Sequence, residues 1–339
     1  MVGRGCWLHN KSMDNWEALR EMDMFWGAIM VVLGGVAGSF ASAAIYRIPH
    51  DGLSLIRPLR SFCPACRHFV RWHDNLPILG WILLRGKCRD CKAPIGVSYI
   101  GHELTLALAF WVAGFSWAAL SFGTLVVALI VLTSLWIAAV VDWKHLILPD
   151  GITLGGVIVG IAVAPFCPEF QLGADFARPL WFVSNQIIDI CGSQAMLALV
   201  AAVVSGIISF LLLFGIRALF SYLLGQEALG FGDVKFLAAV GALLGLEAAL
   251  WTLLVGVLLG SLLGLLNVVR MTLLVWKRNR QRAIFNPTAK VLFRGWRLGR
   301  RIPFGPPLVL GTTILLLFPG FARVFFLETW PKTLQLLLN

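Results

Sequence analysis

The chain has 339 residues, of which 59% are hydrophobic and only 13% are charged. A soluble domain carries about 25% charged residues, so this composition excludes an ordinary soluble protein. The net charge of +11 does not call for a nucleic-acid partner, because basic loops beside anionic lipid headgroups explain it. We therefore expect a membrane protein whose partner is the lipid bilayer and not a nucleic acid.

Apolar residues are grouped in long blocks, which is typical of membrane-spanning helices. A helix needs about 20 mainly apolar residues to cross the hydrocarbon layer. The blocks predict an all-α polytopic membrane protein with about eight transmembrane helices, the fourth and sixth of them short. Their approximate ranges are 24–45, 100–118, 121–141, 152–166, 193–217, 234–248, 250–269 and 305–326.

The distribution of Lys and Arg predicts the orientation. Residues 46–98 contain nine of these cations and residues 270–303 contain ten, whereas residues 167–192 contain one. Lys and Arg favour the cytoplasmic side, and eight spans put both basic stretches on that side. Both termini then face outward. The mixed charges of residues 1–23, followed by a long apolar block, indicate a retained anchor and not a cleaved signal peptide.

In chain order, the sequence divides into four parts. Residues 1–45 hold an N-terminal segment and the first span, 46–98 a cytoplasmic cysteine-rich insert, 99–326 the transmembrane bundle, and 327–339 a C-terminal tail. An insert of about 50 residues is too small to bury a good hydrophobic core by itself. It therefore needs another source of stability.

The insert contains two CxxC pairs, Cys63 with Cys66 and Cys88 with Cys91, separated by 21 residues. Four thiolates at such a spacing bind zinc tetrahedrally, and a reducing cytosol disfavours disulfides. We expect a zinc-knuckle-like site with a structural metal, since four protein ligands leave no open position for chemistry. The alternatives are four unligated thiols or a redox pair.

Two further cysteines, Cys167 and Cys191, fall in the predicted outward loop. A disulfide between them and two free thiols are both open alternatives.

Carboxylates at the predicted ends of spans are the candidates for catalytic groups, because ionisable residues there are costly and usually functional. Asp142 ends the third span, and Asp233 begins the sixth at the same predicted depth. Two carboxyl groups at one site share a proton, so one activates water as a base and the other protonates the leaving group. Gly230 and Gly232 would let the backbone approach a substrate closely. The alternatives are that Asp233 only caps its helix and that Asp150 is the partner carboxylate.

Short motifs follow one another along nearly the whole chain. They are Gly38-Ser39-Phe40, Tyr46-Arg47-Ile48-Pro49, Cys63-Pro-Ala-Cys66, Trp72-His73-Asp74-Asn75-Leu76-Pro77, Gly80-Trp81, Leu84-Arg85-Gly86-Lys87-Cys88, Cys91, Glu103, Asp142, Leu148-Pro149-Asp150, Glu227, Gly230-Phe231-Gly232-Asp233-Val234-Lys235 and Pro303-Phe304-Gly305-Pro306. This ordered set resembles the type IV prepilin peptidases, which are membrane aspartyl proteases with a GxGD signature. A lone GxGD would be a weak signal, whereas the ordered set is specific.

The resemblance implies an aspartic endopeptidase of the bacterial inner membrane, with Asp142 and Asp233 as its cytoplasmic catalytic pair. Its substrates would be type IV prepilins and type II secretion pseudopilins, cut after a Gly. Because all four insert cysteines are kept, the resemblance also implies N-methylation of the new N-terminus with S-adenosylmethionine. The sequence shows no methyl-donor site by itself. Glu227 and Lys235 are the candidates for it, and the alternative is that they form ion pairs within their loop.

Three rival functions share part of this pattern. An intramembrane protease of the presenilin or signal-peptide-peptidase kind would share the carboxyl pair but leaves the cysteine insert unexplained. An ion-coupled transporter would use buried Asp residues to carry protons, but such transporters often contain inverted repeats and this sequence shows none. The third rival is a non-catalytic assembly protein of a secretion machine. Cleavage of a prepilin by the purified protein separates a protease from the last two.

Overall fold

The structure is a computed structural model, and it describes residues 24–50, 52–55, 58, 60–117, 122–170, 194–225, 227, 229–281, 303–318 and 324. Within these residues the chain is mostly helical, without strands, and its two isolated β-bridges lie in the cysteine-rich insert. The predictions for the N-terminal segment, Cys191, the second basic stretch beyond residue 281 and the C-terminal tail lie outside the described residues.

Eight helices lie where the sequence predicts spans. They are α2 (Met24–Arg47), α4 (Ser98–Trp117), α5 (Phe122–His145), α6 (Asp150–Val163), α8 (Gln194–Leu224), α9 (Phe231–Leu244), α10 (Leu246–Gln281) and α12 (Gly305–Leu317). Four of them, α2, α5, α8 and α10, are long and apolar enough to cross a membrane, and α6 and α12 are shorter apolar helices. The chain is therefore a helical membrane protein, and the count of eight spans stays a prediction.

Helix α12 covers the first part of the last predicted span. It ends at Leu317, and of the predicted residues beyond it, up to 326, the structure describes only Phe318 and Val324. Phe318 leaves the helical conformation, with φ −126° and ψ 59°. Pro319 follows it in the sequence, and the residue before a proline is disfavoured in the α conformation.

Small residues set how closely the helices pack. A Cβ atom at Gly38 of α2 would collide with the backbone of Glu103 on α4, and Gly34 is equally close to α4 one turn away. Gly160 of α6 meets the backbone of α9 at Leu243 in the same way. Membrane helices associate through such close backbone approach, because lipid offers no hydrophobic driving force. Glycines therefore set the α2–α4 and α6–α9 contacts.

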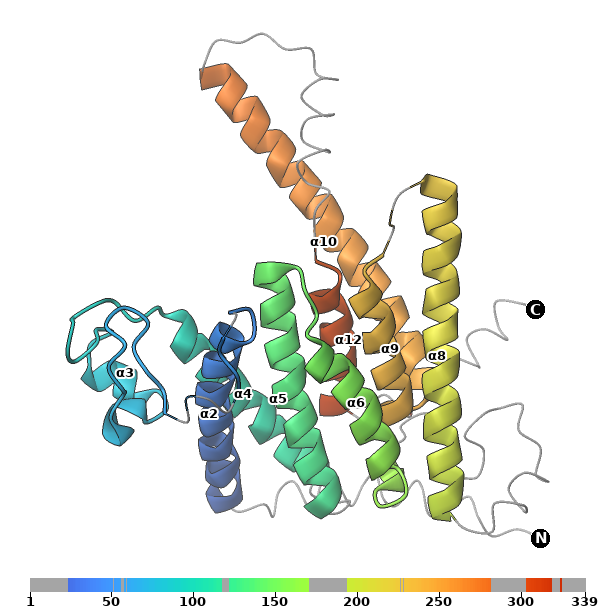
Figure 1. The fold of residues 1–339 in the computed structure, drawn as a ribbon, viewed down its shortest axis with the longest axis horizontal. Coiled ribbons are helices and arrows are strands. Elements are labelled where there is room, and N and C mark those ends of the chain that lie inside the picture. Colours follow the sequence, from blue (N-terminus) through green and yellow to red (C-terminus); the bar gives the residue numbers. More distant parts are fainter. Residues whose placement is uncertain are drawn as a thin grey trace.

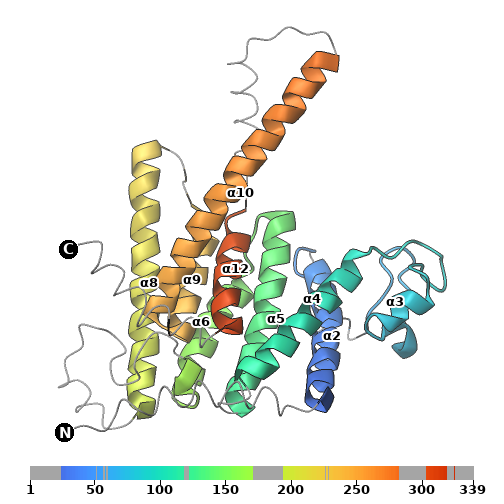
Figure 2. The same ribbon diagram turned by 180° about the vertical axis from the view of Figure 1, so that it is seen from behind.

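One end of the bundle gathers several helix termini. There α2 and α5 end, and α6, α9 and α12 begin (Figure 1). We call this the site end. Leu146, with φ 58°, ends α5, and Pro149 precedes α6. Helix α10 continues well beyond the site end, as both side views show (Figures 1 and 2).

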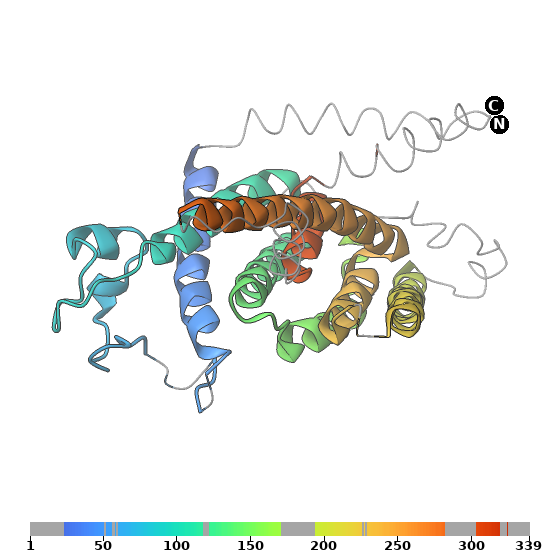
Figure 3. The ribbon, with the colours of Figure 1, turned by 90° about the horizontal axis from the view of Figure 1, so that it is seen from above.

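The insert connects α2 to α4 and contains the 3-10 helix η1 (Trp72–Asn75) and the short helix α3 (Leu79–Leu83). It lies beside α2 and does not cover the end of the bundle, as the view along the helices shows (Figure 3). The hydrophobic core lies in the bundle and not in the insert.

Candidate active site and metal centre

Two carboxyl groups predicted to act together lie together at the site end. Asp142, in the last turn of α5, is 6% exposed, and Asp233, in the first turn of α9, is 7% exposed. They are close enough for the charge of Asp142 to act on Asp233. Chain segments far apart in the sequence therefore bring two buried carboxyl groups to one place.

The first residue of α12 holds Asp142. The backbone N–H of Gly305 donates a hydrogen bond of 3.1 Å to Oδ2 of Asp142. A Cβ atom at position 305 would lie 2.5 Å from that oxygen and would also press on Leu148. Only a glycine therefore allows this close approach between α12 and the carboxyl group.

Asp233 lies against the start of its own helix. Gly230 is the N-cap of α9, and a Cβ atom there would lie 3.1 Å from Oδ2 of Asp233, three residues on. The N-cap is therefore Gly230 and not Asp233, which corrects the alternative that Asp233 only caps its helix; Asp233 lies in the first turn.

The second glycine of the GxGD motif has a packing role. A Cβ atom at Gly232 would lie 3.0 Å from the Cβ of Leu148. Leu148 also lies against Gly305 and therefore connects the start of α9 with the start of α12. The sequence predicts that Gly230 and Gly232 let a substrate approach, and that prediction is untested.

The charged residues around the start of α9 are in ion pairs. Lys235 Nζ lies 2.7 Å from Asp150 Oδ1, and Arg217 lies 3.2 Å from Glu227 Oε1. Both cations also lie over the ring of Phe231, at 5.0 Å for Lys235 and 5.6 Å for Arg217. These contacts fix the loop that carries the GxGD motif. Because Asp150 is paired with Lys235, it is a weaker choice than Asp233 as the partner of Asp142.

The four insert cysteines form a cluster whose sulfur atoms all lie within 4.8 Å of one another. Cys63 Sγ and Cys91 Sγ are 3.9 Å apart. A tetrahedral site with Zn–S distances of about 2.3 Å requires S···S distances of about 3.8 Å. The donor set and its spacing therefore fit a tetrahedral metal with four thiolate ligands. Among the described residues this is the only such cluster of potential ligands.

The two CxxC turns repeat one backbone geometry. Arg67 and Lys92, each directly after the second cysteine of its pair, both have φ 60°. Their N–H groups donate to the carbonyl oxygens of Cys63 and Cys88, at 2.8 Å and 3.0 Å. The thiols influence one another: a backbone hydrogen bond from Cys91 lowers the pKa of Cys88 to about 7, whereas desolvation and hydrogen bonds with the other thiols raise the pKa of Cys66. Two matching turns thus face each other across the cluster.

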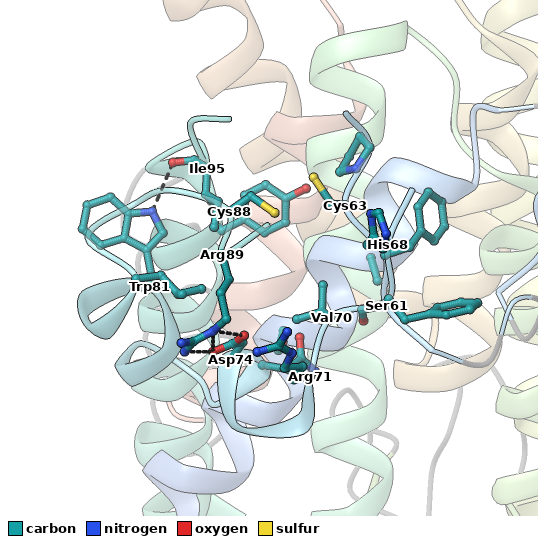
Figure 4. A pocket seen from close by; sticks show the side chains of 18 of the residues that line it. Ser61, Cys63, His68, Val70, Arg71, Asp74, Trp81, Cys88, Arg89 and Ile95 are labelled. Carbon is teal, nitrogen blue, oxygen red and sulfur yellow. Dashed lines mark hydrogen bonds and ion pairs between the residues drawn. The ribbon is translucent and has the colours of Figure 1, made fainter. Parts of the chain in front are cut away.

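A pocket lies between the insert and helices α2 and α4 (Figure 4). Its lining combines aromatic side chains, three carboxyl groups and three guanidinium groups, and among them are Tyr46, Trp81, Tyr99, Asp74, Glu103 and Arg89. Two of the cluster cysteines also face it. Glu227 and Lys235 are not among the lining residues and lie instead at the start of α9.

One ion pair stabilises the wall of this pocket. Arg89 donates two hydrogen bonds to the carboxylate of Asp74, at 2.6 Å and 2.8 Å. The pairing lowers the pKa of Asp74 below its usual value of 3.8. The ion pair is therefore fully present above the ordinary pKa of a carboxyl group, and it is lost only as the pH falls through the lowered value.

Sequence reasoning missed three residues of the candidate active site. Gly305 was noted only as part of the last motif, although its N–H holds Asp142. Leu148 was noted only beside Pro149, although it lies between two helix starts. The sequence gives one indication for Arg217: it is a charged residue within a predicted span, and charged residues there are costly and usually functional.

These features define a class of protein: a helical membrane protein that buries a pair of carboxyl groups at one end and carries a four-thiol insert beside it. Residues 32–117 match the family described as Bacterial Peptidase A24 N-terminal domain, and residues 129–265 match the Type IV leader peptidase family. The chain therefore belongs to the Type IV leader peptidase family, which confirms the resemblance predicted from the motifs.

Relatives with this architecture carry a two-part name. The chain is 34% identical over 244 residues to the prepilin leader peptidase/N-methyltransferase of Klebsiella pneumoniae, covering 70% of this chain and 93% of the relative. It is 30% identical over 319 residues to the protein of the same name from Pectobacterium carotovorum subsp. carotovorum, covering 88% of this chain and 95% of the relative. No solved structure matches the chain.

Proposed function

We propose that this chain cleaves the leader peptide of type IV prepilins and type II secretion pseudopilins and then N-methylates the new N-terminus. The observation that carries the proposal is the buried pair Asp142 and Asp233, held at one end of the bundle in a chain of this family. The names of the relatives support both activities.

The site end is the cytoplasmic end of an eight-span protein of a bacterial inner membrane, with both termini outward. The basic insert lies beside α2 near this end. Helix α10 passes beyond it and carries the exposed cations Lys277 and Arg278 on the part that projects. Basic segments next to spans favour the cytoplasmic side. A substrate with a short polar leader and an apolar helix would then present its cleavage junction at this boundary.

The two carboxyl groups hydrolyse the peptide by general acid–base catalysis. The ionised one takes a proton from water, whose oxygen attacks the carbonyl carbon of the scissile peptide. The protonated one gives its proton to the amide nitrogen, and the C–N bond breaks to leave a carboxylate and an amine. The backbone N–H of Gly305 holds Asp142 in place throughout, and the backbone at Gly230 lies against the carboxyl group of Asp233.

Cys63, Cys66, Cys88 and Cys91 bind one zinc ion that has a structural role. The S···S spacing supports this assignment, and so do the two matching turns. With four protein ligands the ion has no open position, so it stabilises the insert and does not take part in catalysis. Metal binding of this kind contributes directly to the folding free energy of a small insert.

The pocket between the insert and α2 and α4 binds S-adenosylmethionine. Aromatic faces such as those of Tyr46, Trp81 and Tyr99 can stack on a planar adenine and attract a sulfonium cation. The negative charge of a carboxyl group such as Glu103 also attracts the sulfonium cation. When bound, the donor supplies a methyl group to the free amine, which loses a proton as the thioether product is released. We prefer this pocket to Glu227 and Lys235, because both of those side chains are in ion pairs elsewhere.

One experiment tests both activities. Purified protein in liposomes is incubated with a prepilin and S-adenosylmethionine, and the product is measured by intact-mass spectrometry. The expected product lacks the leader and carries one methyl group on its new N-terminus. An uncut substrate would support the transporter or assembly-protein rivals, and a cut but unmethylated product would refute only the methyl-transfer half.

A further inference from the structure

The insert contains a run of nine residues, 76–84, with no charged or hydrogen-bonding side chain except the indole of Trp81. The run includes helix α3. Nine residues are too few to cross a bilayer as a helix, which needs about 20. Short apolar segments of nearly this length are typical of buried helices and of interfacial or re-entrant membrane segments.

The run is not buried within the protein. Leu79 is 58% exposed, Ile82 is 55% exposed and Leu83 is 72% exposed. Leu79 and Leu83 are one helical turn apart and therefore lie on the same face of α3. Trp81 points the other way, lines the pocket and donates a hydrogen bond of 3.1 Å to the carbonyl oxygen of Ile95. The segment is thus anchored on one side and presents a large apolar face on the other.

The position of the run along α2 sets its depth. A Cβ atom at Gly35 would lie 3.1 Å from Pro77, so the two residues are in contact. Gly35 is residue 12 of the 24 in α2, a helix that is long and apolar enough to cross a membrane. It lies about 18 Å along the helix from Arg47 at the site end, whereas the hydrocarbon layer is about 30 Å thick. The two side views show α3 beside α2 and not beyond its end (Figures 1 and 2).

Several backbone N–H groups of the run have partners inside the protein. Ile78 N–H donates a 2.7 Å hydrogen bond to the carboxyl group of Glu103 on α4. Gly80 N–H bonds to Leu76 O at 2.8 Å, and Leu84 N–H bonds to Gly80 O at 3.0 Å. Non-helical backbone at membrane depth is tolerated only where such groups have protein partners.

Two carboxyl groups near the run are in ion pairs. The Asp74 side chain is only 7% exposed and forms its two hydrogen bonds with Arg89. Asp90 lies 3.6 Å from Arg71. Ionisable groups at membrane depth are expected to pair with one another in this way.

We infer that residues 76–84 enter the lipid leaflet at the site end as a re-entrant element, with Leu79, Ile82 and Leu83 facing acyl chains. The insert is then a membrane-embedded unit and not a freely solvated loop. Glu103 holds the point at which the chain turns, by accepting the N–H of Ile78. On the proposed function, the pocket would lie at the level where cleavage leaves the new N-terminus of an apolar helix.

The test measures depth without any substrate. A small fluorescent amino acid is incorporated by amber suppression at Leu83, at Val36 on the exposed face of α2, or at Lys92 at the tip of a CxxC turn. Each full-length variant is reconstituted in phosphatidylcholine liposomes. Quenching is measured with lipids that carry a nitroxide in the middle of the acyl chain and, separately, with aqueous iodide. The comparison includes only variants that are correctly folded. Correct folding is shown by prepilin cleavage or by an unchanged melting curve in detergent.

The expected result is that the probe at position 83 behaves like the one at 36. Acyl-chain nitroxide should quench it at least about twofold more strongly than iodide does, and the probe at 92 should show the opposite order. A probe at position 79 should repeat the result. Iodide quenching at 83 equal to that at 92 would overturn the inference. Protection from both quenchers would also overturn it, because protein and not lipid would then cover the face. Neither outcome bears on whether the chain cleaves prepilins.

Discussion

The site end of the bundle and the cysteine-rich insert hold their functional groups in opposite ways. At the site end, Asp142 and Asp233 are buried, and the backbone N–H at the start of α12 holds Asp142. In the insert, the four thiols are half-buried or exposed, and most of their surroundings are loops and turns. Helix packing positions the first site, whereas the thiols themselves, once bound to a metal, would position the second.

The two regions should therefore respond differently to amino-acid substitutions. A buried carboxyl pair depends on tight backbone contacts, so one added methyl group at Gly305 displaces it. A metal-bound insert depends on ligand number, so one lost thiol loosens the whole unit. Changes at the site end should therefore affect cleavage alone, and changes in the insert should affect methyl transfer first.

Asp142→Asn should reduce prepilin cleavage by at least about 100-fold, because an amide cannot exchange the proton that general acid–base catalysis needs. Methylation of a substrate that was cut beforehand should continue. Intact-mass spectrometry of both reactions measures the two effects. Glu247→Gln, which changes a carboxyl group at the opposite end of the bundle, is the control and should keep both activities. If Asp142→Asn cleaved at the normal rate, the carboxyl pair would not be the catalytic site.

Cys88→Ser should abolish metal binding and reduce methyl transfer by at least about tenfold, because three thiols no longer close a structural site. Cleavage should fall less. Zinc per chain is measured by elemental mass spectrometry, alongside methylation of a pre-cut substrate. Cys167→Ala alters a buried cysteine outside the cluster and should leave the zinc content unchanged. An unmodified protein that contains no zinc after expression in zinc-rich medium would refute the metal assignment.

Gly305→Ala should lower the rate of cleavage by about 10- to 100-fold, since a displacement of about 1 Å is enough to cause such a loss. The new Cβ atom would push against Oδ2 of Asp142. Gly155→Ala is a matched control on α6, where a Cβ atom meets no neighbour within 4 Å. Turnover numbers of the two variants should therefore separate clearly. Equal rates would show that the contact between Gly305 and Asp142 does not position the carboxyl group.

Lys235→Gln should lower cleavage only about fivefold or less, because its partner Asp150 is 64% exposed and exposed ion pairs contribute about 0–1 kcal/mol. Asp150→Asn should have a similar effect, and the double variant should be no worse than either single one. A double-mutant cycle on the rate of cleavage measures this coupling. A loss as large as that of Asp142→Asn would mean that Lys235 contacts the substrate directly.

Much of the fold could be predicted from the sequence. Long apolar blocks favour helices wherever they meet lipid, because the backbone has no other way to satisfy its hydrogen bonds there. A helix lies at each of the eight predicted segments, but the bounds differ for several of them, and α10 continues to Gln281 where the apolar pattern predicts an end at residue 269. The motifs also predicted the family, which the comparisons confirm.

Tertiary structure alone decided which groups meet. The sequence marks Asp142 and Asp233 as unusual, but only the packing of α5, α9 and α12 puts Gly305 against one of them. It equally decided that Pro77 lies against Gly35, halfway along α2. Local sequence determines where helices form, since propensity and hydropathy act over neighbouring residues. Contacts between distant segments depend on how side chains of different helices fit together, and no local pattern encodes that fit.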